Sequence, residues 1–323
     1  MNILVRLPNW LGDMVMSTAF VKAVTKIYPS ATIDVICKES LGDLVTFFPS
    51  VNQIYLFDKK KYNGLKGAYQ FGKMIGRQKK YDLFFCVPDS FSSTLMGYAT
   101  GAKKRIGYKA EFRNFLLTDR YQKAKSSHRA EEYVQLLQQF IGEKIDSPQV
   151  ELKNSISKVQ NRIIINCNSE ATSRRLPVVK AVAVIRQLQE QLKGYEWVMI
   201  GGPKEKEHVD AIVNLLAHDS VVNKAGSTGL KELIELIASA SFMISTDSGP
   251  AHLANALGVK TVVLFGAGNE QNTAPFNASI LKVVRNGSLD CEPCVKNTCQ
   301  YGQPKCLLEL DINKIESAFQ QLL

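Results

Sequence analysis

A short polar stretch in the second half of the chain has the residue types of an anion-binding turn. Ser245-Thr-Asp-Ser-Gly-Pro-Ala-His252 lies between an apolar, strand-like run and a second, helical run. A strand, a turn and a helix start leave backbone N–H groups unpaired at the helix N-terminus, where phosphate binds well. Pro250 suits the first helical turn, and Asp247 or Ser248 can cap it. The stretch predicts a phosphate site, with an ordinary helix cap as the alternative.

A carboxylate follows the first strand pattern of the chain. Residues 2–7 read as a buried strand, Pro8-Asn-Trp-Leu-Gly-Asp13 reads as a turn, and helical spacing begins at Leu11. Ligands of doubly wound sheets bind at the carboxyl ends of strands, so Asp13 is predicted to point toward a cleft. The alternative is an acid that only stabilises the helix start. No G-x-G-x-x-G follows this strand, so a dinucleotide fingerprint is absent.

A third polar loop follows the strand predicted at 162–166. It contains Thr172, Ser173 and Arg174, followed by a second arginine. Hydroxyl and guanidinium groups at the carboxyl end of a strand suit a diphosphate, because arginine supplies forked donors.

The three loops belong to a regular alternation of strands and helices, which predicts parallel sheets covered on both faces. The alternation lapses between 142 and 160 and then resumes. A chain of 323 residues is long enough for two α/β domains. We expect two Rossmann-like domains, at 1–157 and 158–323, with a cleft between them. Packing of the last helix back onto the N-terminal domain is left open.

The charge of the chain is unevenly distributed. The formal net charge is +10, and the segment from Lys59 to Arg129 holds 17 Lys and Arg against four acids. Such a positive field favours an anionic partner, such as nucleic acid, acidic lipid headgroups or an acidic glycan, unless it is merely a soluble basic face. No nucleic-acid-binding module is recognisable, so no nucleic-acid partner is expected. Membrane contact, if any, is expected to be peripheral and electrostatic.

The cysteines and the N-terminus indicate a reducing compartment. No apolar run approaches the roughly 20 residues of a membrane span, and the N-terminus lacks the features of a signal peptide. We therefore expect a cytoplasmic protein with reduced thiols among its seven cysteines. The cluster Cys291-x2-Cys294-x4-Cys299-x6-Cys306 has two interpretations: a structural zinc or iron–sulfur site, or a loop with free or paired thiols.

Several motifs together resemble the ADP-heptose:lipopolysaccharide heptosyltransferases of glycosyltransferase family 9. The resemblance covers nearly the whole chain, and the N-terminal half is most like the heptosyltransferase II type. The motifs that carry it are Pro8-Asn-Trp-Leu-Gly-Asp-Met-Val-Met-Ser17, Pro88-Asp-Ser-Phe-Ser-Ser93, Arg105-Ile-Gly-Tyr108, Arg174-Arg-Leu-Pro177, Asp247-Ser-Gly-Pro-Ala-His252 and Thr273-Ala-Pro275. The resemblance implies a GT-B fold, an acceptor bound by the first domain, a nucleotide sugar bound by the second, and inversion at the anomeric carbon.

The resemblance also implies roles for individual residues. Asp13 would be the general base, and Arg174 would take up the charge of the departing diphosphate. The implied donor-binding residues are Thr172, Ser173, Arg174, Glu205, Asp247, Ser248, Gly249 and His252. The implied acceptor-binding residues are Asn9, Trp10, Arg105 and Arg113. His208 and His218 are expected at the surface.

The implied substrates are ADP-heptose and the anionic inner core of lipopolysaccharide, with no required cofactor and peripheral contact with the inner membrane of a Gram-negative bacterium. Two departures lie beside the donor site. Arg174-Arg-Leu-Pro177 replaces the family's Lys-Arg-Trp-Pro, and Gly266-Ala-Gly-Asn-Glu-Gln271 replaces its Gly-Pro-Thr-Asp-Pro loop. The alternatives are therefore a GT-B enzyme that uses a UDP- or GDP-sugar, and a non-catalytic binder of anionic glycolipid.

Overall fold

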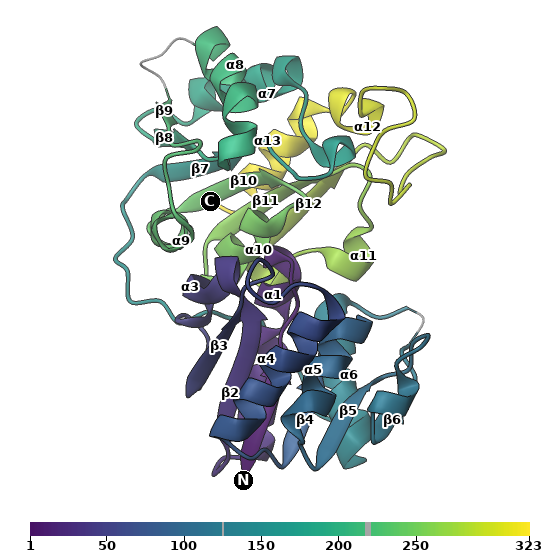
Figure 1. Cartoon of the computed structure of the whole chain (residues 1–323). Coiled ribbons are helices and arrows are strands. Elements are labelled where there is room, and N and C mark those ends of the chain that lie inside the picture. Colours follow the sequence, from purple (N-terminus) through teal and green to yellow (C-terminus); the bar gives the residue numbers. More distant parts are fainter. Residues whose placement is uncertain (125, 217–220) are drawn as a thin grey trace. The chain divides into compact units, whose positions relative to one another are not determined.

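The structure is a computed structural model that describes residues 1–124, 126–216 and 221–323. The chain divides into two compact units, Met1–Lys153 and Asn154–Leu323, whose elements are labelled in Figure 1. The division falls slightly before the boundary predicted at residue 157. His218 lies outside the described residues. Within the described ranges, no helix has the length and apolar character needed to cross a membrane.

The N-terminal unit is a doubly wound parallel sheet. Its described residues form six strands in the order β3-β2-β1-β4-β5-β6, with every neighbouring pair parallel. Helices cover both faces of this sheet (Figure 1). The elements are β1 (Asn2–Arg6), α1 (Leu11–Met16), α2 (Thr18–Ile27), β2 (Thr32–Lys38), η1 (Glu39–Leu41), α3 (Gly42–Val45), β3 (Gln53–Phe57), α4 (Gly64–Gln78), β4 (Leu83–Cys86), α5 (Phe91–Thr100), β5 (Lys104–Tyr108), η2 (Asn114–Leu116), β6 (Asp119–Tyr121) and α6 (Arg129–Ile141).

Glycines allow the helices on one face of this sheet to pack closely. Gly72 and Gly76 lie one turn apart on α4, on the side that meets α5. A Cβ atom at Gly72 would lie 2.2 Å from the carbonyl oxygen of Met96, and one at Gly76 would lie 2.1 Å from that of Thr100. Any larger residue would therefore push the two helices apart.

The C-terminal unit repeats the scheme. The described residues of this unit form a six-stranded sheet in the order β12-β11-β10-β7-β8-β9, again with parallel neighbours. The elements are β7 (Arg162–Asn166), η3 (Thr172–Arg174), α7 (Val178–Gln191), β8 (Glu196–Met199), η4 (Pro203–Glu205), α8 (Lys206–Leu216), β9 (Val222–Asn223), α9 (Leu230–Ala238), β10 (Phe242–Thr246), α10 (Gly249–Ala256), β11 (Lys260–Phe265), α11 (Glu270–Thr273), η6 (Ala278–Ile280), β12 (Leu281–Arg285), α12 (Lys305–Leu308) and α13 (Ile312–Gln320).

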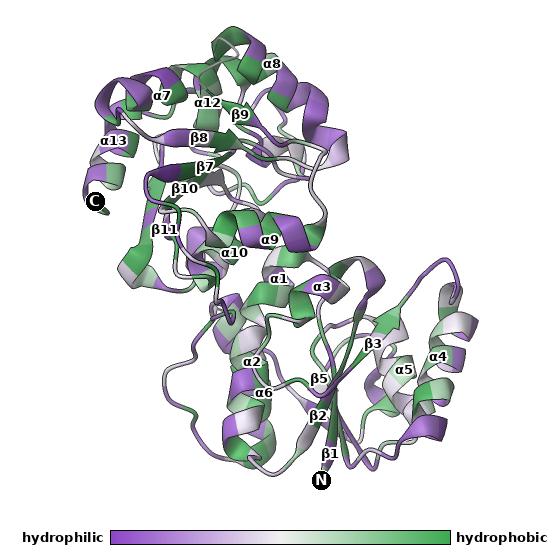
Figure 2. Cartoon of the chain, turned by 90° about the vertical axis from the view of Figure 1, so that its left-hand side faces the viewer, coloured by the Kyte–Doolittle hydropathy of each residue, from purple (hydrophilic) through white to green (hydrophobic). Residues whose placement is uncertain are grey.

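The last helix, α13, packs within the C-terminal unit. It contacts β11, β12 and α7, and its buried Ile315 and Phe319 join the hydrophobic core of that unit. The Phe319 ring lies 4.7 Å from the ring of Phe242 on β10. In Figure 2, hydrophobic colour is concentrated in the strands and in the sides of the helices that cover them.

The strand order fixes where a site can form. In both sheets the order reverses beside the first strand, between β1 and β4 in one unit and between β7 and β10 in the other. Ligands of doubly wound sheets bind outside the carboxyl ends of the strands at this reversal. The loops after β1, β4, β7 and β10 are therefore the places to look, and they carry the predicted Asp13, Arg174 and Asp247.

Candidate functional site

The loop after β10 starts α10 without a side-chain cap. Ser248 is the N-cap residue, and its hydroxyl makes no hydrogen bond to the first turn of the helix. The hydroxyl donates to the Thr246 carbonyl oxygen at 3.1 Å and accepts from the side-chain amide of Asn166 at 2.8 Å. Gly249 and Pro250 form the first helical positions. Because no side chain caps this helix start, its N–H groups suit an anion.

Asp247 is a buried carboxylate at this turn, with 4% of its surface exposed. Its Oδ2 lies 3.1 Å from Nη1 of Arg174, which comes from the loop after β7. Burial raises the pKa of Asp247 to about 6, while the nearby Arg174 and Arg285 act in the opposite direction. The Arg174 side chain is about one quarter exposed, so it can also reach a ligand. The structure thus joins two of the predicted donor residues across the strand reversal.

A third loop, which follows β11, closes against Asp247. A Cβ atom at Gly268 would lie 2.0 Å from Oδ2 of Asp247, so this position requires glycine for packing. Arg285 at the end of β12 holds the loop: it donates to the Gly266 carbonyl oxygen at 2.8 Å and to Glu270 at 3.0 Å. Sequence reasoning missed Arg285 and Glu270, although it singled out this loop as unusual.

The predicted hydroxyl ligands Thr172 and Ser173 face another part of the chain. Ser173 is buried, its hydroxyl donates to the carbonyl oxygen of Lys296, and its N–H donates to that of Asn297 at 3.2 Å. The Thr172 hydroxyl donates to the same Asn297 carbonyl at 3.3 Å. These contacts fix the cysteine-rich segment to η3. The donor contacts predicted for Thr172 and Ser173 stay predictions, and the Ser173 hydroxyl is buried and engaged with Lys296 in this structure.

The other two predicted donor residues have structural contacts. Glu205 accepts a hydrogen bond of 2.7 Å from the N–H of Gly202 and so caps the helical segment that begins there. His252 is a buried residue of α10. His208, expected at the surface, is half-buried, with a ring nitrogen 3.0 Å from the Leu176 carbonyl oxygen.

The four clustered cysteines line one cavity of the C-terminal unit. Across the described residues, no group of three or more His, Cys, Asp or Glu side chains is placed to hold a metal ion. All four cysteines instead line one small cavity as free thiols, and burial raises the pKa of Cys306 to about 11. Cys299 donates its thiol proton to the Gln303 carbonyl oxygen at 3.1 Å. Both interpretations of the cluster, a structural metal site and a loop with free or paired thiols, therefore stay predictions.

In the N-terminal unit, a buried arginine shapes the turn after β1. Arg6 is 1% exposed and donates to the carbonyl oxygens of Leu7 at 2.6 Å and Ile36 at 3.2 Å. It also donates to the side-chain oxygen of Asn9. This hydrogen bond holds the turn and engages the Asn9 amide oxygen. The next residue, Trp10, is 62% exposed and precedes the first residue of α1.

Asp13 lies in the first turn of α1, in a half-buried position. The Tyr133 hydroxyl donates to its Oδ1 at 3.3 Å, and Nε of Arg129 lies 3.7 Å from the same oxygen. Burial raises the pKa of Asp13, and Arg129 and the Tyr133 hydrogen bond oppose that rise. Tyr133 keeps its proton because burial raises its own pKa well above the usual value. The carboxylate is therefore oriented by α6 and still partly open to solvent.

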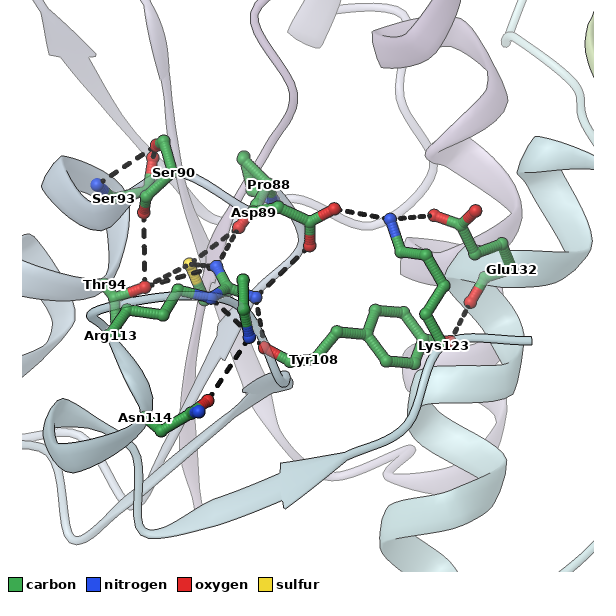
Figure 3. A network of polar contacts seen from close by, with 12 residues as sticks. Pro88, Asp89, Ser90, Ser93, Thr94, Tyr108, Arg113, Asn114, Lys123 and Glu132 are labelled. Atoms are coloured by element: carbon green, nitrogen blue, oxygen red, sulfur yellow. Dashed lines mark hydrogen bonds and ion pairs between the residues drawn. The ribbon is translucent and has the colours of Figure 1, made fainter. Parts of the chain in front are cut away.

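Charges of alternating sign form a chain that begins at Arg129 beside Asp13, and Figure 3 shows its part from Glu132 through Lys123 to Asp89. Arg129 pairs with Glu132 at 3.1 Å, Glu132 with Lys123 at 2.9 Å, and Lys123 with Asp89. Asp89 belongs to the loop after β4, which is the other loop at the strand reversal. The chain of ion pairs therefore links both loops of the site to α6. Sequence reasoning missed these partners, because only the fold brings Asp89 to Lys123, 34 residues away in the sequence.

Two predicted acceptor residues are structural. Arg113 is fully buried and donates to the carbonyl oxygens of Tyr108 and Pro88, the latter at 2.6 Å, with Asp89 at 3.2 Å. Arg105 donates to backbone carbonyls at 2.8 and 2.9 Å and lies over the ring of Tyr98. These contacts hold both side chains within the unit, and the acceptor contacts of the two arginines stay a prediction.

Comparisons with known proteins show the class of protein to which this fold belongs. The model of glycosyltransferase family 9 (heptosyltransferase) matches residues 69–305. The solved structure titled "E. coli ADP-heptose lps heptosyltransferase II" has a TM-score of 0.82, with 24% identity over all of this chain and 98% of that one. A glycosyltransferase family 9 structure from Veillonella parvula has a TM-score of 0.86, with 21% identity over 99% of this chain and 96% of that one. The fold is therefore the GT-B fold of glycosyltransferases.

The family follows from the extent of the match. The chain belongs to glycosyltransferase family 9 and is a glycosyltransferase. It is 28% identical to lipopolysaccharide heptosyltransferase 2 of Escherichia coli (strain K12), over 88% of each chain. It is 27% identical to lipooligosaccharide heptosyltransferase 2 of Haemophilus ducreyi, over 100% of this chain and 99% of the relative.

Proposed function

We propose that the protein transfers L-glycero-D-manno-heptose from ADP-heptose to the inner core of lipopolysaccharide, with inversion at the anomeric carbon. Relatives that carry the name lipopolysaccharide or lipooligosaccharide heptosyltransferase 2 support the donor sugar and the acceptor class. A solved structure titled "E. coli heptosyltransferase WaaC with ADP", of the same fold, supports ADP as the leaving group. The observation that carries the proposal is the carboxylate of Asp13, held by Tyr133 and Arg129 at the carboxyl end of β1.

Asp13 acts as the general base in this proposal. Its carboxylate accepts the proton of the acceptor hydroxyl as that oxygen forms a bond to the anomeric carbon. In the same step the bond from the anomeric carbon to the β-phosphate oxygen breaks, and ADP departs with the bonding electrons. A single displacement of this kind inverts the anomeric centre. The raised pKa of Asp13 makes it a stronger base than an exposed aspartate, while the nearby Arg129 favours its ionised form.

The C-terminal unit binds the donor in this proposal. The uncapped start of α10, with the N–H groups of Ser248 and Gly249, accepts the diphosphate, and Arg174 balances the charge that develops on it. Asp247 faces the heptose hydroxyls as their hydrogen-bond acceptor. Three further residues stay candidates for donor binding because of their positions in the C-terminal unit: Thr172, Glu205 and His252.

The N-terminal unit binds the acceptor in this proposal. Asn9 positions the turn, and the exposed Trp10 offers an aromatic face beside Asp13. The excess of lysine and arginine between Lys59 and Arg129 suits the carboxylates and phosphates of an inner-core glycolipid. A cytoplasmic enzyme with peripheral contact to the inner membrane fits such an acceptor.

A donor-competition assay tests the proposal. The purified protein is supplied with an acceptor core that lacks heptose and with ADP-heptose, a UDP-hexose or a GDP-hexose, and the product mass is measured. We expect a product that is one heptose heavier with ADP-heptose alone. Transfer from a UDP- or GDP-sugar would instead indicate that the unusual loop at 266–271 accommodates a different nucleotide sugar. No transfer from any sugar would favour a non-catalytic glycolipid binder.

A further inference from the structure

Two phenylalanines of the N-terminal unit are presented to solvent on one short loop. Phe112 is 81% exposed and Phe115 is 72% exposed, and both lie between β5 and β6. Phe112 also has a positive φ of 58°, a backbone conformation that is costly for a bulky side chain. Largely exposed aromatic rings in a strained loop are unfavourable in a protein that meets only water.

The loop is built to hold these rings outward. Between them in the sequence lies Arg113, which is fully buried and bound to the Tyr108 and Pro88 carbonyl oxygens and to Asp89 (Figure 3). The side chain of Asn114 closes the loop by accepting a hydrogen bond of 3.3 Å from the N–H of Ala110. The anchor fixes the backbone, so the exposure of the rings is a property of a fixed loop.

The apolar surface continues onto the neighbouring helix. The ring of Phe115 lies 6.3 Å from that of Phe91, the first residue of α5. Phe91 and Tyr98 are seven residues apart and therefore lie on the same side of α5. Tyr98 is 48% exposed. Together, Phe112, Phe115, Phe91 and Tyr98 form an aromatic surface along the loop and α5.

Two exposed cations accompany this aromatic surface, against one exposed acid in the loop, Glu111. Lys109 directly follows β5 and Arg120 lies on β6, on either side of the loop in the sequence, and both are exposed. Neither side chain makes an ion pair or a side-chain hydrogen bond within the part of the chain that the structure describes. Exposed aromatic rings with unpaired cations beside them match the chemistry of a bilayer surface, where rings enter the acyl boundary and cations meet anionic headgroups.

We infer that the loop from Lys109 to Phe115 docks the N-terminal unit onto an anionic lipid bilayer by inserting Phe112 and Phe115. Insertion of aromatic rings into a bilayer is a separate interaction from the proposed transfer reaction. It also differs from a purely electrostatic contact with the membrane surface. The test does not use the transfer reaction, so failure of the proposed function and failure of this inference are separate results.

Vesicle sedimentation tests the inference with the full-length protein. Vesicles are made of phosphatidylcholine with or without phosphatidylglycerol, and binding is compared for the wild type, the double variant Phe112→Ser/Phe115→Ser, and Val179→Ser. Val179 is 74% exposed on α7 of the other unit and serves as the matched control. We expect the wild type and Val179→Ser to bind anionic vesicles alike, and the double variant to bind at least about tenfold more weakly.

A tryptophan in the loop reports insertion directly. We expect the fluorescence of Phe112→Trp to gain a blue-shifted component in anionic vesicles and to be quenched by brominated acyl chains. Both phenylalanines are exposed, so the double variant should keep the thermal unfolding midpoint of the wild type. Equal vesicle binding by the wild type and the double variant, or no binding of the wild type to anionic vesicles, would overturn the inference.

Discussion

The buried carboxylate of Asp247 should cost the C-terminal unit stability at neutral pH, and Asp247→Asn should remove that cost. Burial raises its pKa from the ordinary 3.8 to about 6 in the folded protein. Above pH 3.8 the unfolded chain releases this proton more readily than the folded chain does. The folded state therefore loses stability as the pH rises from 3.8 to about 6, and the loss is complete above that pH.

The magnitude follows from the size of the shift. One pKa unit corresponds to about 1.4 kcal/mol, so a shift of roughly two units costs about 3 kcal/mol of unfolding free energy. An asparagine has the same shape without the charge. In Asp247→Asn the Arg174 guanidinium loses its charged partner. Solvent still hydrates it, since its side chain is 26% exposed. Relative to Asp247→Asn, the wild type should thus lose about 3 kcal/mol between pH 3.8 and pH 6.

Urea unfolding followed by tryptophan fluorescence measures this difference. Trp197 lies on β8 and is 4% exposed, whereas Trp10 is exposed in the other unit. In a Trp10→Phe background, fluorescence reports the C-terminal unit alone. The reasoning would be refuted by a stability difference between wild type and Asp247→Asn that stays constant with pH, or by one that moves in favour of the wild type as the pH rises.

Three further changes test other parts of the structure. Gly268→Ala should weaken ADP binding by roughly tenfold in calorimetry, because its Cβ displaces the buried carboxylate opposite, while Gly229→Ala, whose Cβ meets only an atom 3.9 Å away, should not. Arg129→Gln should move the acidic limb of the kcat/KM profile to higher pH, because the cation that lowers the pKa of Asp13 is lost; an unchanged limb would contradict this role of Arg129. Arg113→Leu should lower the unfolding free energy by about 3 kcal/mol or more in urea titrations, and a smaller loss would show that its buried hydrogen bonds matter little.

The alternation of strands and helices made the fold class predictable. Apolar strand runs such as the one at 2–7 are buried on both faces, so their pattern is strong and local. The edge strands β6 and β12 escaped prediction, because Asp119–Tyr121 and Leu281–Arg285 mix charged and apolar residues, as edge positions do. Their place in the sheet depends on pairing with β5 and β11, which no local pattern encodes.

The candidate site was predictable where one loop carries the chemistry. Asp247 directly follows β10, and Asp13 and Arg174 lie in the first segments after β1 and β7. Each parallel sheet brings such segments to the carboxyl edge of its own strands. The contacts that hold them were not predictable. Tyr133 reads as an apolar core position of α6, and only the fold brings its hydroxyl to Asp13, 120 residues away in sequence. Arg113 was expected to bind the acceptor, and nothing local shows that backbone carbonyls surround it.

The central claim is that Asp13 is the general base for transfer of heptose from ADP-heptose. The most direct measurement is kcat for this transfer by the wild type, Asp13→Asn and the control Asp43→Asn, which changes an exposed acid in the first turn of α3. All three should bind ADP with equal affinity. We predict a loss of about 10²–10⁴-fold in kcat for Asp13→Asn alone. A folded Asp13→Asn that keeps the full kcat of the wild type would contradict the claim.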